Sequence, residues 1–399
     1  MANEKTNIPH ADWAFPTKIR FGFGRVAELP EACRELNMVR PLLVTDAGIA
    51  ALPMTAQIME SCRTAGLGIE LFENVQPNPV ERNVTDGVAV YHAGEHDGVI
   101  ALGGGSSLDV GKAIAFMAPQ RHPLRELTLA SFQDYAVVEP KLVASGLPPV
   151  ITVPTTSGTG SEVGRAAAII DEESQVKKGL FHPVMMPELC IADPELTLSL
   201  GPAVTAAVGL DALSHSLEAY CCAFNHPFAD GVALQGMALV KEAQVAAFRD
   251  GSDLDARARM MMASLAGGTA FQKGVGAVHA LSHPLSARHD IHHGLANGVL
   301  MPYVLVFNMP VIETKLEALA RFLNLLDPTA RAVIDWLLEL RAQCEIPHSL
   351  AALGIAEADV EILAPLAAND ITAVENPIAV TEADMAKLYR AALAGELKL

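Results

Sequence analysis

The sequence lacks cysteines with the spacing of a metal or redox motif, a long apolar run and a basic, apolar leader. Its uninterrupted apolar runs, such as Val99–Leu102 and Ala166–Ile170, are far shorter than the roughly 20 residues that span a bilayer. The segment Met1–Asp12 carries acidic and polar residues, unlike a signal peptide. The 6 cysteines show no CxxC spacing, which predicts reduced, buried thiols: Cys33, Cys62, Cys190, Cys221, Cys222 and Cys344. We therefore expect a soluble, cytoplasmic protein.

Positive charge is also scarce. The chain has 28 lysines and arginines against 46 aspartates and glutamates, which gives a formal net charge of −18. Such a surface repels the phosphates of nucleic acids and anionic lipid headgroups. The composition therefore predicts neither nucleic acid nor membrane as a partner and leaves a small molecule as the expected ligand.

Apolar residues are plentiful, at 51% of 399 residues, and a chain of this length is expected to form two domains. In the first half, short apolar runs alternate with helical stretches and glycine turns. The runs predicted as buried parallel strands are Pro41–Thr45, Gly98–Leu102, Pro149–Val153 and Cys190–Ala192, and the helices predicted among them include Met54–Ala65 and Asn83–Gly94. This alternation predicts an α/β domain over residues 1–195, with a Rossmann-like parallel sheet that lacks the GxGxxG fingerprint.

After Asp193 the pattern becomes helical, which predicts an all-α domain over residues 196–399. Thr197 or Ser199 is a suitable N-cap ahead of its first helix. The stretches with helical spacing are Pro202–Tyr220, Asp230–Phe248, Asp253–Gly274, Glu313–Leu325 and Thr329–Ala342. With no low-complexity linker between them, the two domains are expected to pack closely around a cleft.

Two loops at predicted strand ends have the composition of a nucleotide site. The first, Gly103–Ser107, joins a strand to a helix, so its glycines and the free N–H groups of the helix start favour a diphosphate. Ser106 or Ser107 could cap this helix and bind phosphate oxygen. The second loop, Thr155–Ser161, holds five hydroxyl side chains and two glycines, a set suited to a ribose or a carboxamide.

Asp46 follows the predicted strand Pro41–Thr45. A carboxylate at a strand end can accept hydrogen bonds from the ribose hydroxyls of NAD and would repel the 2′-phosphate of NADP. The alternative is that Asp46 is simply a helix cap. The first interpretation predicts a preference for NAD.

A carboxylate and several histidines have the spacing of metal ligands. Asp211 and His215 are four residues apart in a helical stretch, which places both on one face. His279 and His283 repeat this spacing, and the pair His292–His293 follows. One carboxylate with imidazoles suits Fe²⁺ or Zn²⁺ rather than Mg²⁺ or Ca²⁺. Such an ion would act as a Lewis acid on a substrate oxygen.

The sequence resembles the iron-dependent (group III) alcohol dehydrogenase family over nearly its whole length. The resemblance rests on five motifs: Gly103–Ser106, Thr155–Glu162, Asp193–Thr197, Gly209–Tyr220 and His293–Asn297. It implies a nucleotide-binding α/β domain followed by a helical domain. It also implies the metal ligands Asp211, His215, His279 and His293, with His292 left outside the ligand set. It places the catalytic residue His283 near the nicotinamide, where it would relay the proton or orient the ring.

The same resemblance implies which residues contact the cofactor. These are Asp46, Asn78, Gly105, Ser106, Thr155, Thr156, Thr159 and Lys177. The chain departs from the family at Gly164, where threonine is common, and loss of that side chain is expected to make room. Phe271 is expected to contribute an apolar lining to the substrate pocket.

Together these features predict an NAD-dependent alcohol dehydrogenase or aldehyde reductase. Iron is the expected metal, with zinc possible, and the enzyme is expected to form a homodimer or a higher homo-oligomer. One alternative is a zinc-dependent polyol dehydrogenase of the glycerol type. Another is a metal-dependent lyase or hydrolase, although such an enzyme would not need paired phosphate loops. A lyase of the dehydroquinate-synthase type would also need more lysine and arginine around the motifs than this chain has.

Overall fold

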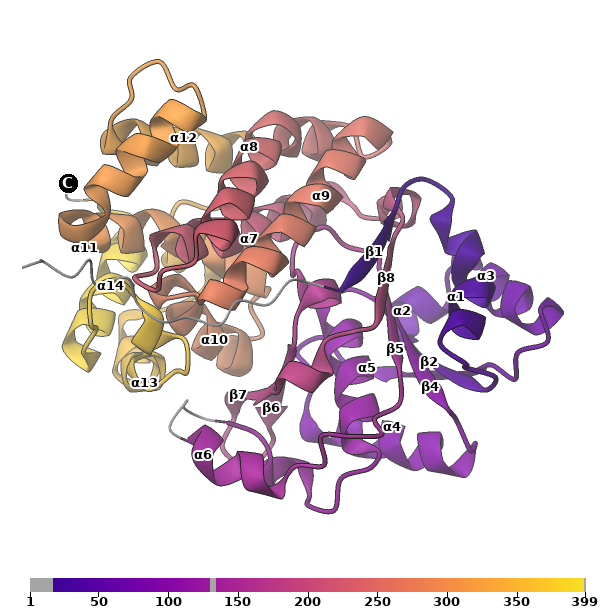
Figure 1. Ribbon diagram of the computed structural model, residues 1–399. Helices are drawn as coiled ribbons and strands as arrows, with labels where there is room; N and C mark the ends of the chain where they lie inside the picture. Colours follow the sequence, from indigo (N-terminus) through magenta and orange to yellow (C-terminus); the bar gives the residue numbers. More distant parts are fainter. Residues whose placement is uncertain (1–16, 130–133, 398–399) are drawn as a thin grey trace, which may run out of the picture.

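The computed structural model describes residues 17–129 and 134–397, so the prediction about Met1–Asp12 falls outside the described residues. Figure 1 shows two parts, a sheet flanked by helices in indigo to magenta and a bundle of helices in red to yellow. Each part has its own apolar core, and the core of the bundle runs from Ala206 to Ala392.

The described part of the N-terminal half contains a parallel sheet of 6 strands in the order β1-β8-β5-β4-β2-β3. The strands are β1 (Lys18–Phe21), β2 (Pro41–Asp46), β3 (Glu70–Val75), β4 (Gly98–Gly103), β5 (Val150–Pro154) and β8 (Leu189–Ala192). The predicted fold class is therefore confirmed, and the four strands expected from the sequence lie within a residue or so of their predicted bounds. The sequence did not predict β1 and β3, which lie at the two edges.

Helices cover both faces of this sheet because its strands are apolar on both sides. Along β4, Val99 faces the core formed with α4 (Glu81–Ala93) and α5 (Gly105–Met117), whereas Ile100 faces the core formed with α1 (Leu29–Glu35) and α3 (Pro53–Thr64). Successive strand residues point to opposite faces, so a continuous apolar run is what a sheet covered on both sides requires.

An antiparallel hairpin of β6 (Ala166–Asp171) and β7 (Val176–Phe181) extends from this half, and the sequence prediction missed it. The hairpin lies below the bundle in Figure 1, and β7 contacts α10 (Ala277–His289) of the helical half. It therefore brings residues of the α/β half close to the helices that follow.

The described C-terminal half, residues 196–397, is helical and contains no strand. Its helices are α7 (Pro202–Cys221), α8 (Pro227–Arg249), α9 (Leu254–Ala270), α10 (Ala277–His289), α11 (His293–Phe322), α12 (Ala330–Gln343), α13 (Glu357–Ala368) and α14 (Glu382–Ala394). Two predictions were wrong in detail. Neither Thr197 nor Ser199 caps α7, which begins after Gly201 without a side-chain cap, and Glu313–Leu325 covers only the end of the much longer α11.

Helix α11 is long and apolar enough to cross a membrane by composition, with a mean hydropathy of 1.6 over its most apolar window. However, 67% of that window is buried inside the protein, as in a core helix. The prediction from uninterrupted runs overlooked this helix because polar residues such as Asn297 and Asn308 interrupt its apolar sequence.

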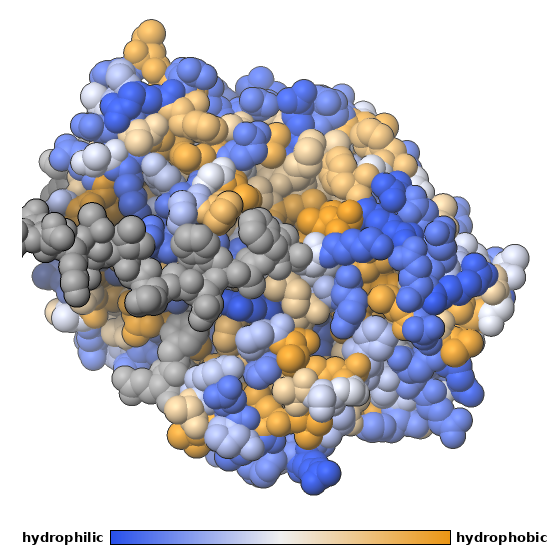
Figure 2. Space-filling model, in the orientation of Figure 1, coloured by the Kyte–Doolittle hydropathy of each residue, from blue (hydrophilic) through white to orange (hydrophobic). Residues whose placement is uncertain are grey.

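Polar and apolar residues are interspersed over the face shown in Figure 2, and a paler area lies over α8 and α9. A groove of about 540 Å³ lies between these two helices, and its lining includes Phe228, Leu239 and Met262. None of the residues predicted to bind metal or cofactor lines this groove. All 6 cysteines are free and buried, as predicted.

Candidate active site

The two predicted nucleotide loops lie side by side at the carboxyl ends of β4 and β5. Gly103 pairs with Pro154, and the N–H of Thr155 donates to the carbonyl of Gly103 at 2.9 Å. A Cβ atom built on Gly105 would lie 2.7 Å from Cγ2 of Thr159, closer than side chains pack. Glycine at position 105 thus allows the loops to touch, and the crevice at such strand ends is where α/β sheets bind ligands.

These loops have free hydrogen-bonding groups that suit a dinucleotide. The buried hydroxyls of Thr155, Thr156 and Ser157 have no partner among the described residues. Helix α5 begins after Gly104 with no side-chain cap, so the prediction that Ser106 or Ser107 caps it was wrong. Its uncapped N–H groups are the kind of site that binds phosphate.

Asp46 is the N-cap of the short helix α2 (Ala47–Ala50). Its Oδ1 accepts hydrogen bonds from the N–H groups of Gly48 and Ile49, at 2.9 and 3.0 Å. Its Oδ2 accepts from the Ser107 hydroxyl at 3.3 Å, beside the glycine turn. The cap interpretation therefore holds in the structure, and the same carboxylate still borders the predicted phosphate loop.

Asn78 and Lys177 lie where the two halves of the protein meet. Asn78 has a positive φ of 53° and donates from its amide to Asp290 of the helical half at 2.8 Å. Lys177, on β7, lies within electrostatic reach of Asp109, Asp211 and Asp370, and burial lowers the pKa of its ammonium group. Neither residue contacts the two loops directly through a hydrogen bond within the described chain.

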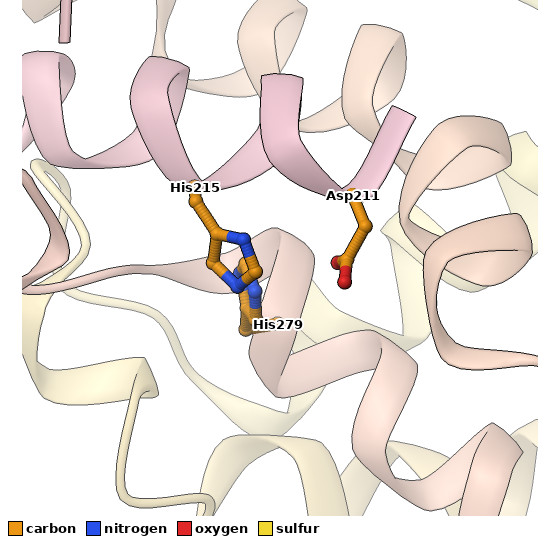
Figure 3. Close-up of side chains that lie close together, drawn as sticks. All are labelled: Asp211, His215 and His279. Atoms are coloured by element: carbon orange, nitrogen blue, oxygen red, sulfur yellow. The ribbon is translucent and has the colours of Figure 1, made fainter. Parts of the chain in front are cut away.

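Three of the predicted metal ligands converge from two helices. Figure 3 shows Asp211 and His215 extending from the same side of α7, with His279 of α10 beneath them. One ligand atom from each residue lies within 4.8 Å of the others, and their exposed fractions are 2%, 6% and 3%. The fourth, His293, begins α11, and its Nε2 lies 3.8 Å from Oδ1 of Asp211.

Glycines let the ligand helices approach closely. A Cβ atom on Gly294, next to His293, would lie 2.3 Å from the carbonyl of Ala207 and 2.9 Å from Cβ of Asp211. A Cβ atom on Gly267 of α9 would lie 3.1 Å from Cβ of His215. The positions of the ligands therefore depend on close backbone packing of α7 against α9 and α11.

Each histidine predicted as a ligand directs its Nδ1 towards a protein acceptor. Nδ1 of His215 lies 3.2 Å from the carbonyl of Gly158 in the hydroxyl-rich loop, and Nδ1 of His293 lies 3.2 Å from the Ser282 hydroxyl. Nδ1 of His279 lies 2.5 Å from the Glu218 carboxylate. With Nδ1 occupied in this way, Nε2 of each ring is the atom left to face a metal, the usual arrangement in metal-binding histidines. In this structure the Asn297 amide nitrogen lies 3.1 Å from Nε2 of His293 and 3.5 Å from Nε2 of His279.

The charge state of these rings fits a divalent ion. Burial lowers the pKa of His215 to about 4 and the pKa of His293 well below its usual value. Neutral imidazoles near pH 7 have a lone pair ready for a metal, so binding need not displace a proton from them. One buried carboxylate with three imidazoles is a donor set for Fe²⁺ or Zn²⁺.

His283 lies one turn after His279 and stacks on His293, with ring centroids 5.2 Å apart and planes inclined by 17°. Its Nδ1 donates to Asp370 at 2.8 Å. Burial lowers the pKa of His283. Burial alone would raise the pKa of Asp370, but the charge and hydrogen bond of His283 bring it below its usual value. The structure thus forms a buried histidine–carboxylate pair beside the ligand cluster.

The sequence analysis missed three residues of this site. Glu218 and Asp370 bind the histidine pair of α10, and the Asn297 amide donates to Oδ1 of Asp211 at 2.8 Å. Glu218 and Asn297 stand inside the recognised motifs, and Glu218 shares the face of α7 that carries Asp211 and His215. Asp370 has no comparable local signal because it is far from His283 in the sequence.

Gly164 does not leave the expected open space. A Cβ atom at this position would lie 3.2 Å from Cζ of Phe271, so the phenyl ring occupies the place beside the glycine. The ring centroid of Phe271 lies 5.3 Å from that of His215. The expectation that loss of the threonine makes room was therefore wrong, and Phe271 is an apolar neighbour of a predicted ligand.

Comparisons with known proteins agree with this geometry. Residues 16–194 match the family model for iron-containing alcohol dehydrogenase, and residues 205–393 match the C-terminal model of the same family. The chain is 39% identical to 4-hydroxybutyrate dehydrogenase of Cupriavidus necator over 354 residues, which cover 86% of this chain and 89% of that protein.

Solved structures give the same result. A crystal structure of 1,3-propanediol oxidoreductase superposes with a TM-score of 0.90 at 33% identity, covering 96% of this chain and 100% of the other. Sulfoacetaldehyde reductase from Bifidobacterium kashiwanohense, solved in complex with NAD⁺, gives 0.85 at 25% identity, covering 96% and 99%. The chain belongs to the iron-containing alcohol dehydrogenase family and is an oxidoreductase that acts on CH–OH groups.

Proposed function

We propose that this enzyme interconverts a primary alcohol and its aldehyde, with NAD as coenzyme and Fe²⁺ held by Asp211, His215, His279 and His293. The observation that carries the proposal is the direct contact between the two predicted sites. The hydroxyl-rich loop after β5 accepts, through the carbonyl of Gly158, the Nδ1 hydrogen of His215. A dinucleotide on that loop and an ion on that ring would therefore be neighbours.

The residues of the chain would bind and orient both groups. The uncapped start of α5 and the free hydroxyls of Thr155 and Thr156 would hold the diphosphate and the adjoining ribose. When bound, the ion supplies Lewis acidity towards the substrate oxygen and the dinucleotide exchanges the hydride. Phe271, beside His215, would provide an apolar wall for the carbon chain of the substrate.

His283 would move the proton. Asp370 accepts the hydrogen of its Nδ1, which leaves Nε2 as the atom able to take up or return a proton. Because burial lowers its pKa, His283 is neutral near pH 7 and ready to act as a base. In the oxidative direction it would accept the hydroxyl proton, and in the reductive direction it would return it.

The finer assignments belong to the same proposal. Asp46 borders the loop and would favour NAD over NADP through charge repulsion. Asn78, Gly105, Ser106, Thr159 and Lys177 would contribute to cofactor binding, as the family resemblance implies. We further propose that the boundary near residue 195 separates two domains and that the enzyme works in the cytoplasm as a homo-oligomer.

The test is metal analysis of protein purified without oxygen, followed by removal of the metal and reconstitution with Fe²⁺ or Zn²⁺. Turnover is then measured as absorbance at 340 nm with NAD and a panel of primary alcohols. We expect about one ion per chain and greater turnover with iron. Turnover without any metal would contradict the proposed site. Full activity with zinc alone would show that zinc, and not iron, is the metal of the enzyme.

A further inference from the structure

Glu218 binds the start of helix α10 from outside that helix. Its Oε1 accepts the N–H of Val278 at 2.7 Å, and its Oε2 accepts the N–H of His279 at 3.4 Å. Helix α10 follows Gly276 and has no side-chain cap of its own. A carboxylate at this point satisfies exposed N–H groups and complements the positive end of the helix dipole.

The same carboxylate holds the His279 ring. Oε2 lies 2.5 Å from Nδ1 of His279, and both side chains are buried. A carboxylate accepts hydrogen bonds, so the nitrogen that faces it carries the hydrogen. Nε2 of His279 is then unprotonated in the neutral ring and available for a metal. Glu218 thus acts on the position of the helix, on the rotation of the ring and on its tautomer.

We propose that Glu218 is the positioning residue of the metal site and sets the affinity for the divalent ion through His279. This inference rests on the proposed function insofar as His279 is a ligand. One face of α7 supplies three groups: the proposed ligands Asp211 and His215, and the Glu218 carboxylate, which orients the third ligand. Partners of this kind typically contribute 10–100-fold to metal affinity.

Glutamine is the informative replacement because it has the same shape but one acceptor fewer. If its amide NH₂ faces Nδ1 of His279, two donors oppose each other and the ring must move its hydrogen to Nε2, the atom that the metal needs. If the amide is turned over, its NH₂ faces the N–H of Val278 instead. Either arrangement disturbs the ring or the helix start, so the carboxylate cannot be replaced without loss.

The experiment measures the affinity of the full-length protein for Zn²⁺ by competition with a chromophoric chelator. The absorption spectrum of the Co²⁺-substituted protein provides a second readout. We expect Glu218→Gln to bind Zn²⁺ about 10–100-fold more weakly and to show an altered Co²⁺ spectrum. Affinity for NAD should stay within about twofold, because the hydrogen bonds of Glu218 in the described chain go to Val278 and His279 and not to the dinucleotide loops.

Glu375→Gln is the matched control. Oε2 of Glu375 accepts the N–H of Val275 at 3.2 Å, so this carboxylate also supports the segment before α10, yet it has no hydrogen bond to His279. We expect this variant to keep the wild-type affinity for Zn²⁺. If Glu218→Gln does not fold, Glu218→Asp carries the test, because its shorter side chain keeps the charge but withdraws from the ring.

Two results would overturn the inference. One is a folded Glu218 variant with wild-type affinity for Zn²⁺ and an unchanged Co²⁺ spectrum. The other is an equal loss of affinity in Glu375→Gln, which would assign the effect to the helix start rather than to the ring. Failure of the proposed function looks different, because then the wild-type protein itself would bind no metal at the site.

Discussion

The dinucleotide side and the metal side of the site are built in opposite ways. The first consists of loops at strand ends, with uncapped N–H groups and buried hydroxyls that have no partner in the described chain. The second consists of side chains on helices, and each ligand ring already has a hydrogen-bond partner. The loops thus leave bonds to be completed by a ligand, whereas the helices fix their donors in advance.

Asp211→Ala gives the strongest test of this separation. It removes the carboxylate among the ligands, so metal affinity should fall by more than the roughly 100-fold that loss of a ligand's hydrogen-bond partner can cost, and turnover should disappear. NAD affinity should remain, because the loops are built separately. Metal content and NAD titration measure the two effects. His292→Ala is the control, since His292 is exposed and should be dispensable for metal. Parallel loss of NAD and metal would show that the two sides are not separate.

His283→Ala tests whether metal binding and proton transfer depend on different residues of the metal side. The variant should keep its metal and lose turnover by about 100-fold, as is usual when a group that transfers a proton is removed. Asp370→Asn leaves the His283 ring in place but removes the carboxylate that accepts its Nδ1 hydrogen. We therefore expect a smaller loss of turnover than in His283→Ala. Turnover and metal content measured on the same samples distinguish the outcomes, and loss of metal from His283→Ala would make His283 a ligand.

Asp46→Asn tests the dinucleotide side with a change in charge alone. Asparagine is as good an N-cap as aspartate, so α2 should be preserved while the repulsion of a 2′-phosphate is removed. The ratio of kcat/KM with NADP to kcat/KM with NAD should rise at least about tenfold, which corresponds to about 1.4 kcal/mol. An unchanged ratio would leave Asp46 with a capping role alone.

Glu375, in the helical half, is expected to have a smaller effect, which is on the pH dependence of the free energy of unfolding. Burial raises its pKa to about 7 from a usual value of 4.5, so the folded state holds its proton more tightly than the unfolded state. Its contribution to stability is complete below about pH 4.5 and is lost as the pH rises through 7, by at most about 3 kcal/mol. Glu375→Gln should flatten the pH dependence of unfolding in this range, measured with denaturant. A slope equal to that of the wild type would refute the assignment.

Much of the fold followed from the sequence because buried elements have a strong signal. Apolar runs such as Gly98–Leu102 match strands that are covered on both faces, and they were found almost to the residue. The edge strand β3 was missed because its residues alternate less regularly, with a burial pattern that is mostly exposed. The start of α11 was missed because it was recognised as a histidine motif and not as a helix.

Site residues that lie close together in the sequence could be predicted. Those that meet only across a long sequence separation could not. Asp211 and His215 share a helix face, so their spacing was enough to suggest that they act together. Asp370 reaches His283 only through the packing of α13 against α10, which no local pattern records. The effect at Gly164 was misjudged for the same reason, since Phe271 fills the space from another segment.

An ion bound at the proposed metal centre would also act as a cross-link. Its predicted ligands come from α7, α10 and α11. Helices α10 and α11 are consecutive, but α7 lies well before them in the chain, so an ion would close a long loop that an unfolded chain leaves open. Binding energy at such a site becomes folding energy, about 2.7 kcal/mol when the free ion is at 100 times its dissociation constant. A chelator would consequently act on this enzyme as a mild denaturant as well as an inhibitor, and its thermal stability would follow the metal supply of its surroundings.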